Sequence, residues 1–138
     1  MTAVPANAGP FNIGQAASQS GVSAKMIRHY EALGLLPAVH RTDANYRQYQ
    51  GNDVHTLRFI RRARLLGFSM AEIAELLKLW QNKRRASADV KRIAETHVAD
   101  LDRRIAEMQA MRQTLAQLAV CCAGDDRPDC PILSGLAD

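Results

Sequence analysis

Residues 12–34 have the sequence NIGQAASQSGVSAKMIRHYEALG, which predicts two short helices joined by a tight turn. Asn12 is a suitable N-cap for the first helix, and Gly21 is a residue type that commonly ends one. Ser23 is the expected N-cap of the second helix, whose apolar positions recur at helical spacing up to Gly34. The stretch is a candidate helix-turn-helix, although two-helix units of this size are common and periodicity alone is a weak signal.

A short basic hairpin is expected next. Pro37 breaks helical structure, and the segments Ala38–Arg41 and Tyr46–Tyr49 are predicted to form two strands around a turn that includes Asn45. Arginine and tyrosine side chains would then decorate the hairpin, which makes it a candidate wing that grips phosphates. A purely structural hairpin with solvated arginines is the alternative that these residues leave open.

Two more helices are predicted after the hairpin. The first covers Asp53–Leu66, is amphipathic and is ended by Gly67. Ser69 and Glu72 have the spacing of a capping box, which opens a second helix that continues through Trp80.

A much longer helix is predicted from Ser87 to about Val120, where the chain has no Pro or Gly and apolar residues recur mostly three or four apart. A helix of that length would extend on the order of 50 Å. Because so small a domain cannot bury so long a stripe, we expect it to pair with a second copy in a two-helix coiled coil.

Charge is unevenly distributed over the 138 residues. Residues 1–70 carry eight basic and three acidic side chains, whereas the remainder carries ten basic and eleven acidic ones. A basic first half is typical of a module that binds a polyanion, and a solvated basic face is the alternative. Residues 1–11 lack the features of an export signal, and no apolar run approaches the roughly 20 residues needed to cross a bilayer. We therefore expect a flexible leader, a cytoplasmic protein and no membrane partner.

Three cysteines, Cys121, Cys122 and Cys130, lie close together near the C-terminus. Such crowding does not suit a disulfide scaffold, and in a reducing cytosol clustered thiols more often bind metal or perform redox chemistry. Gly124 permits a turn between Cys122 and Cys130, and Pro128 stiffens the return. Two soft thiolates without a local His suit linear coordination of a monovalent d¹⁰ ion such as Cu(I), whereas structural Zn²⁺ normally takes four ligands.

The three cysteines also allow functions of other classes. A thiol redox sensor would use the cysteines differently, and a loss of response in a Cys121→Ser variant but not in Cys122→Ser would favour it. An iron–sulfur switch usually needs four cysteine ligands, and the chain has three. An enzyme is disfavoured because the chain lacks a Cys-x-x-Cys pair and a His close to the thiols.

The order of these parts and several short motifs resemble the MerR family of transcription regulators. The motifs are Ile13-Gly-Gln-Ala-Ala, Ile27-Arg-His-Tyr-Glu31, Gly34-Leu-Leu-Pro37, Tyr46-Arg-Gln-Tyr49 and Ile60–Phe68. The resemblance runs from about residue 12 to 135, and the cysteine-bearing tail looks like the copper-efflux branch in particular. It implies a non-enzymatic regulator that binds double-stranded promoter DNA as a homodimer and acts with RNA polymerase. Metal binding would activate genes for metal efflux or detoxification.

The resemblance also implies which residues carry these roles. Those implied to contact DNA lie on the second helix and the hairpin: Lys25, Arg28, Tyr30, Arg41, Tyr46, Arg47 and Tyr49. Many family members have Gly where this chain has Asn45, and Asn tolerates the same backbone region. Cys122 and Cys130 are the expected metal ligands, with one ion per loop. Cu(I) is favoured, and Au(I) or Ag(I) are the alternatives.

Ser87 and Lys91 of the second copy are expected near this loop, because an antiparallel dimer brings the start of one long helix to the end of the other. Two thiolates and one monovalent ion leave a negative charge, which the helix N-terminus and the Lys91 ammonium would stabilise. The resemblance agrees, since divalent-ion sensors of the family carry Cys where this chain has Ser87. Cys121 is expected not to be a ligand.

The sequence therefore predicts a mainly α fold: a winged helix-turn-helix DNA-binding domain, a long antiparallel coiled-coil dimerisation helix and a C-terminal metal-binding loop. The expected segments are a flexible leader at 1–11, the DNA-binding domain with its second helix pair at 12–80, a linker at 81–86, the dimerisation helix at 87–120, and the metal-binding loop and tail at 121–138.

Overall fold

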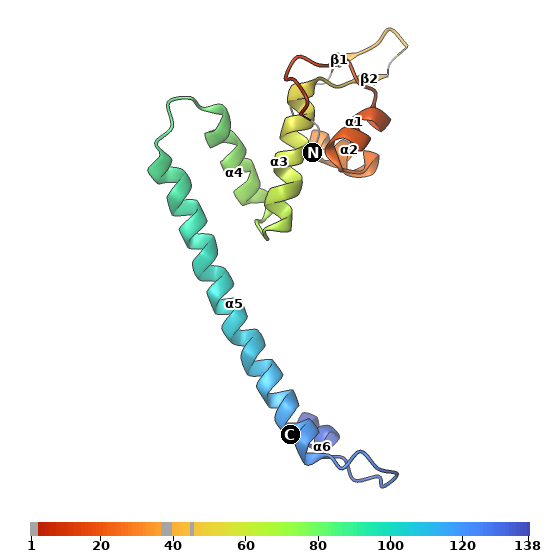
Figure 1. Cartoon of the computed structure of the whole chain (residues 1–138), viewed down its shortest axis with the longest axis vertical. Coiled ribbons are helices and arrows are strands. Elements are labelled where there is room, and N and C mark those ends of the chain that lie inside the picture. The colour runs from red at the N-terminus through yellow and green to blue at the C-terminus, as the bar shows by residue number, and fades with distance from the viewer. Residues whose placement is uncertain (1–2, 37–39, 45) are drawn as a thin grey trace. The chain divides into compact units, whose positions relative to one another are not determined.

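The computed structural model describes residues 3–36, 40–44 and 46–138 (Figure 1). It divides into two compact units, Met1–Val90 and Lys91–Asp138. The mainly helical fold predicted from the sequence is confirmed. Within the described residues the elements are, in order, α1 (Ile13–Ser20), α2 (Ala24–Ala32), β1 (His40–Arg41), β2 (Arg47–Gln48), α3 (Gly51–Leu65), α4 (Met70–Gln81), α5 (Ser87–Cys121) and α6 (Pro131–Ala137).

The caps predicted for α1 and α2 are present. The Asn12 side chain accepts a hydrogen bond from the backbone N–H of Gln15 at 2.8 Å, which starts α1. The Ser23 hydroxyl accepts one from the N–H of Met26 at 3.2 Å, which starts α2. Gly21 ends α1 with a φ of 78°, in the left-handed region that favours glycine. α1 and α2 therefore form the expected helix-turn-helix.

The hairpin after α2 is present, and its second strand is shorter than predicted. β1 and β2 pair in antiparallel fashion with Arg41 opposite Arg47. The Thr42 N–H donates to the Tyr46 carbonyl at 2.8 Å, which closes the turn. The roles predicted for Pro37 and Asn45, and for strand residues 38 and 39, lie outside the described residues.

The segment before α1 is packed, whereas the sequence predicted a flexible leader. Phe11 and Tyr49 exchange two backbone hydrogen bonds of 2.7 and 2.8 Å. The Ala8 carbonyl accepts the N–H of Gly51 at 2.8 Å, and the Ala6 carbonyl accepts that of the next residue at 2.9 Å. These are N–H groups at the start of α3, which have no acceptor within their own helix. The segment therefore caps α3 through its backbone.

Side-chain caps start the second helix pair. The Asp53 carboxylate accepts the N–H of Gln50 at 2.8 Å, so Asp53 lies inside the first turn of α3 and the helix begins two residues earlier than predicted. Ser69 and Glu72 form the predicted capping box at the start of α4, with reciprocal bonds of 3.2 and 2.9 Å.

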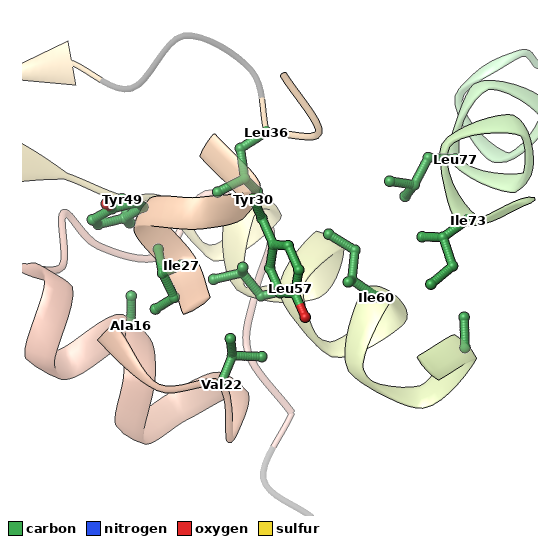
Figure 2. Packing of buried hydrophobic residues seen from close by; sticks show 11 residues of the cluster. Ala16, Val22, Ile27, Tyr30, Leu36, Tyr49, Leu57, Ile60, Ile73 and Leu77 are labelled. Carbon is green, nitrogen blue, oxygen red and sulfur yellow. The ribbon is translucent and has the colours of Figure 1, made fainter. Parts of the chain in front are cut away.

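The first unit has a hydrophobic core to which both helix pairs and the hairpin contribute (Figure 2). Ile27 of α2, Leu57 and Ile60 of α3 and Ile73 of α4 have no exposed surface. Tyr49, which follows β2, is also fully buried. Burying an aliphatic side chain of this size contributes about 1.5–3 kcal/mol. The core therefore packs α2, α3 and α4 together with Tyr49, the residue that follows β2.

The second unit contains most of α5 and a short helix that the sequence did not predict. α5 has 35 residues and ends at Cys121, one residue later than expected. α6 packs against α5, because a Cβ atom on Gly135 would lie 2.6 Å from Cδ2 of Leu118. The loop between the two helices is therefore closed at its base.

A row of large apolar side chains on α5 is exposed. Its members are Val98, Ile105, Met108, Met111 and Leu115, each more than half exposed. None of the helices formed by the described residues is both long and apolar enough to cross a membrane.

Candidate functional site

α2 presents a basic face outside the core. Lys25, Arg28 and His29 are exposed, whereas Ile27 has no exposed surface. Because a helix turns by about 100° per residue, the buried position fixes which side of α2 faces outward. A helix of this kind, with cations on its outer side, can approach both phosphates and base edges of a DNA duplex.

Tyr30 lies in the core rather than on that face. It is 3% exposed, and its ring packs between α2 and α3 near Leu57 and Ile60 (Figure 2). Its edge borders a shallow hollow lined also by Arg61 and Arg64. The sequence implied that Tyr30 contacts DNA. The aromatic ring fills the space between the helices, so only the edge beside this hollow is open to a partner, and the DNA contact stays a prediction.

The hairpin places its predicted residues in two different environments. Arg41 is exposed, and Tyr46 is 71% exposed near the turn. Arg47, by contrast, donates from Nε to Oε2 of Glu31 at 2.9 Å, and this hydrogen bond raises the pKa of the guanidinium. Arg47 is therefore committed at least in part to α2.

Tyr49 also faces inward, which corrects its predicted role as a DNA contact. Its hydroxyl donates to Oε1 of Glu31 at 3.1 Å. Burial, together with the neighbouring Glu31 carboxylate, raises the pKa of Tyr49 to about 12. The hydroxyl thus keeps its proton and acts as a donor within the unit.

An arginine cluster on α3 was missed as a candidate DNA contact. Arg58 donates from Nε and Nη2 to the Gln19 carbonyl at 2.9 and 2.7 Å, which ties α3 to the end of α1. Arg61 lies against Gly21 of the turn, and with Arg58 and Arg62 it lines a hollow beside α1. The basic run from Arg61 to Arg64 is visible in the sequence and contributes to the basic charge of residues 1–70.

The two cysteines predicted to bind metal lie at the two ends of the loop between α5 and α6. Cys122 directly follows α5, and its N–H donates to the Ala119 carbonyl at 3.2 Å. Cys130 directly precedes α6, and its carbonyl accepts the N–H of Ser134 at 3.1 Å. Both are half-buried free thiols, whereas Cys121 is exposed. α5, which precedes Cys122, and α6, which follows Cys130, pack against each other at Leu118 and Gly135.

The loop is shaped by its own side chains. Gly124 has a φ of 68°, as expected for a turn. Asp125 accepts a hydrogen bond from the N–H of Arg127 at 3.0 Å and one from its Nε at 2.9 Å, and these bonds lower the pKa of Asp125. The Asp125 carboxylate therefore holds the loop in shape through Arg127. In the parts of the chain that the structure describes, no three His, Cys, Asp or Glu side chains gather into a metal site.

Ser87 and Lys91, which were predicted to approach the loop of a second copy, lie at the start of α5. Ser87 is the first residue of the helix. Lys91 is exposed and forms a long ion pair of 3.7 Å with Glu95 on its own helix. Such an exposed pair stabilises a protein by at most about 1 kcal/mol. The ammonium group can therefore exchange this partner for another at little cost.

Family comparison agrees with this architecture. The profile described as MerR HTH family regulatory protein matches residues 11–80. The chain belongs to the MerR family. A second profile, described as MerR, DNA binding, matches residues 54–118, so the family assignment extends into α5. MerR proteins are transcription regulators and not enzymes.

Individual MerR-family relatives match nearly the whole chain. Heavy metal-dependent transcription regulator 2 of Rhizobium meliloti (strain 1021) is 58% identical, over 93% of this chain and 87% of the relative. The HTH-type transcriptional regulator CueR of Salmonella typhimurium is 41% identical, over 92% of each. Among solved structures, PbrR691 of Ralstonia metallidurans CH34 in complex with lead(II) is 28% identical with a TM-score of 0.80, over 91% of this chain and 98% of that one.

Proposed function

We propose that this MerR-family chain is a cytoplasmic, homodimeric regulator that binds promoter DNA and senses Cu(I) through the thiolates of Cys122 and Cys130. The supporting observation is that these half-buried free thiols lie at opposite ends of a loop whose base is closed by α6. Relatives named as heavy metal-dependent regulators and as CueR support a metal as the signal. Au(I) and Ag(I) are the alternative ions.

The chemistry of the loop favours a soft monovalent ion. Thiolate sulfur prefers soft cations, and the Asp125 carboxylate is already bonded to Arg127. With two thiolates, a monovalent ion leaves one negative charge, whereas a divalent ion leaves none. In the proposed antiparallel dimer, Ser87 and Lys91 of the second copy stabilise that remaining charge with the positive end of α5. Lead(II), which is bound in the structure of PbrR691, is therefore a useful divalent comparison.

The proposed DNA surface combines α2 and the outer side of the hairpin. It uses the exposed side chains of Lys25, Arg28, Arg41 and Tyr46. Phosphate contacts of this kind set register and orientation on the duplex. Two copies related by two-fold symmetry would meet two half-sites of a promoter that RNA polymerase also occupies.

Regulation then depends on the shape of the promoter. We infer that ordering of the Cys122–Cys130 loop against the second copy changes the angle between the two DNA-binding units. Bending a site of this length costs on the order of a few kcal/mol, which protein contacts must supply. The target genes are expected to encode efflux or detoxification of the sensed metal.

A metal titration of the full-length wild-type dimer tests this proposal. Under reducing conditions and with a competing chelator, Cu(I), Ag(I), Au(I), Hg(II), Pb(II) and Zn(II) are compared for affinity and for stoichiometry per chain. One monovalent ion per chain, held more tightly than the divalent ions, supports the proposal. Tighter binding of Zn(II), Hg(II) or Pb(II) rejects the argument from two thiolates.

A further inference from the structure

Glu31 connects the helix and the hairpin that the proposed DNA surface combines. It is the one acidic residue in the α2 sequence AKMIRHYEA. Both of its carboxylate oxygens are used: Oε2 accepts from Nε of Arg47 at 2.9 Å, and Oε1 accepts from the hydroxyl of Tyr49 at 3.1 Å. The Glu31 side chain is only 19% exposed. Each hydrogen bond involves at least one charged group, the class that contributes most per bond.

Arg47 and Tyr49, the two donors, are themselves held in place. Their bonds to Glu31 therefore fix the position of β2 relative to α2. Tyr49 is fully buried and pairs through its backbone with Phe11. Arg47 is paired across the hairpin with Arg41, one of the exposed cations of the wing. A shift of β2 relative to α2 would have to break both bonds to Glu31. The spacing between Arg41 on the hairpin and Arg28 on α2 is therefore set through this carboxylate.

We propose that Glu31 is a positioning residue that sets the spacing between wing and recognition helix and thereby the selectivity of DNA binding. On this view Arg47 serves as the partner of Glu31 and not as a phosphate ligand. The inference rests on the proposed DNA surface, since it concerns the distance between that surface's two parts.

The direction in which DNA affinity changes when the Glu31 charge is removed tests the positioning role. A carboxylate near the DNA-facing side of the unit repels phosphates, so its removal alone should tighten binding to every duplex. If Glu31 positions the wing, its removal should instead weaken binding to the preferred sequence. The two effects point in opposite directions, and the isosteric Glu31→Gln substitution separates them.

The probes are a duplex selected from a random library by the full-length wild-type dimer and a scrambled duplex of the same length and composition. We expect Glu31→Gln to bind the selected duplex about tenfold more weakly, as for loss of charged hydrogen bonds, and to bind the scrambled duplex as well as wild type or better. Glu75→Gln removes the same charge from an exposed site on α4 and is the matched control. It should weaken neither interaction.

Arg47 supplies a second readout that loss of stability would not produce. If Arg47 serves Glu31, Arg47→Gln leaves the salt dependence of binding unchanged, and its effect is not additive with that of Glu31→Gln. If Arg47 binds a phosphate, the slope of log affinity against log salt falls by about one. Tyr49→Phe keeps the buried ring and removes one bond to Glu31, so an intermediate loss of selectivity is expected from a variant that remains folded.

The outcomes separate the inference from the function on which it rests. Equal or tighter binding of Glu31→Gln to the selected duplex, or a reduced salt slope in Arg47→Gln, overturns the positioning role and leaves the DNA surface standing. A wild-type dimer that selects no sequence at all overturns both.

Discussion

Cys121, Cys122 and Cys130 are three free thiols of which the proposed sensor uses two. Because Cys122 and Cys130 supply both donors, Cys122→Ser and Cys130→Ser should each lower Cu(I) affinity by more than about 100-fold, beyond what loss of an outer-sphere group costs. Cys121→Ser is the matched control, since Cys121 is adjacent in sequence but exposed. Competitive titration with a Cu(I) chelator measures all three. Retained Cu(I) affinity in the Cys122→Ser or the Cys130→Ser variant contradicts the ligand assignment.

Tyr49 makes the stability of the first unit depend on pH in the alkaline range. Its pKa is raised to about 12, whereas tyrosine in an unfolded chain titrates near about 10. Below pH ~10 both states hold the proton and the stabilisation is complete. Between about pH 10 and about pH 12 only the folded state holds it, so the free energy of unfolding falls as pH rises.

Urea unfolding, followed by the fluorescence of the single Trp, Trp80, measures this fall at several alkaline pH values. Tyr49→Phe should show a shallower decline than wild type, because the group that links folding to pH has been removed. Tyr46→Phe alters an exposed tyrosine and should decline as wild type does. Parallel curves for all three proteins would show that Tyr49 is not the coupled group.

At the scale of the element, the segment before α1 acts as a backbone cap on α3. The backbone of Gly51 approaches the Pro5 carbonyl so closely that a Cβ atom there would collide with it. Gly51→Ala should therefore displace the segment and lower the free energy of unfolding by about 1–3 kcal/mol. Gly14→Ala is the control, because that helical position has room for a Cβ and should gain up to about 1 kcal/mol. Equal stability of the two variants in urea would exclude the cap.

Local signals explain which elements could be predicted from the sequence. Asn12, Ser23 and Ser69 cap their helices through bonds to residues three positions away, so the short-range pattern contains the whole interaction. The packed N-terminal segment depends instead on backbone bonds to Gly51 and to Tyr49, which no local pattern records.

Among the site residues too, those fixed by local pattern could be predicted and those fixed by long-range contacts could not. The outward side of α2 could be predicted from helical period, because Lys25 and Arg28 lie away from the buried Ile27. The inward positions of Tyr30 and Tyr49 could not, since an aromatic side chain near a basic face suits either packing or DNA contact. Their burial depends on α3 and on Phe11, which the motif itself does not contain.

α6 escaped prediction because PILSGLA combines an initial Pro with an internal Gly and is too short for a periodic pattern. Gly135 is nevertheless the residue that lets α6 approach Leu118. Gly135→Ala should push α6 away from α5 and weaken Cu(I) binding by about tenfold, because the loop ends are then less well held. Ser134→Ala, on the same helix and exposed, should bind as wild type does. Unchanged affinity in Gly135→Ala would mean that the loop does not depend on α6.

At the scale of the whole molecule, the longest helix of a single chain, α5, keeps an exposed apolar face. The exposed apolar row on α5 has no cover within the described chain, and an apolar patch of this kind marks an association surface. Each such side chain contributes about 1.5–3 kcal/mol when it is buried. The same pairing would bring Ser87 and Lys91 of one copy to the loop of the other. Dimerisation and metal sensing are therefore expected to fail together.

The double variant Ile105→Glu/Met108→Glu tests this coupling, because two charges in a closed apolar interface lose their hydration without gaining a counter-ion. We expect sedimentation as a monomer at micromolar concentration, at least about 100-fold weaker association, and loss of both Cu(I) binding and selective DNA binding. Gln113→Glu/Gln117→Glu adds the same two charges on the opposite side of α5, where they stay hydrated, and should remain dimeric and metal-binding. If the Ile105/Met108 variant sediments as a dimer, α5 does not form the interface. If it is monomeric yet holds Cu(I) as tightly as wild type, the second copy contributes nothing to the metal site.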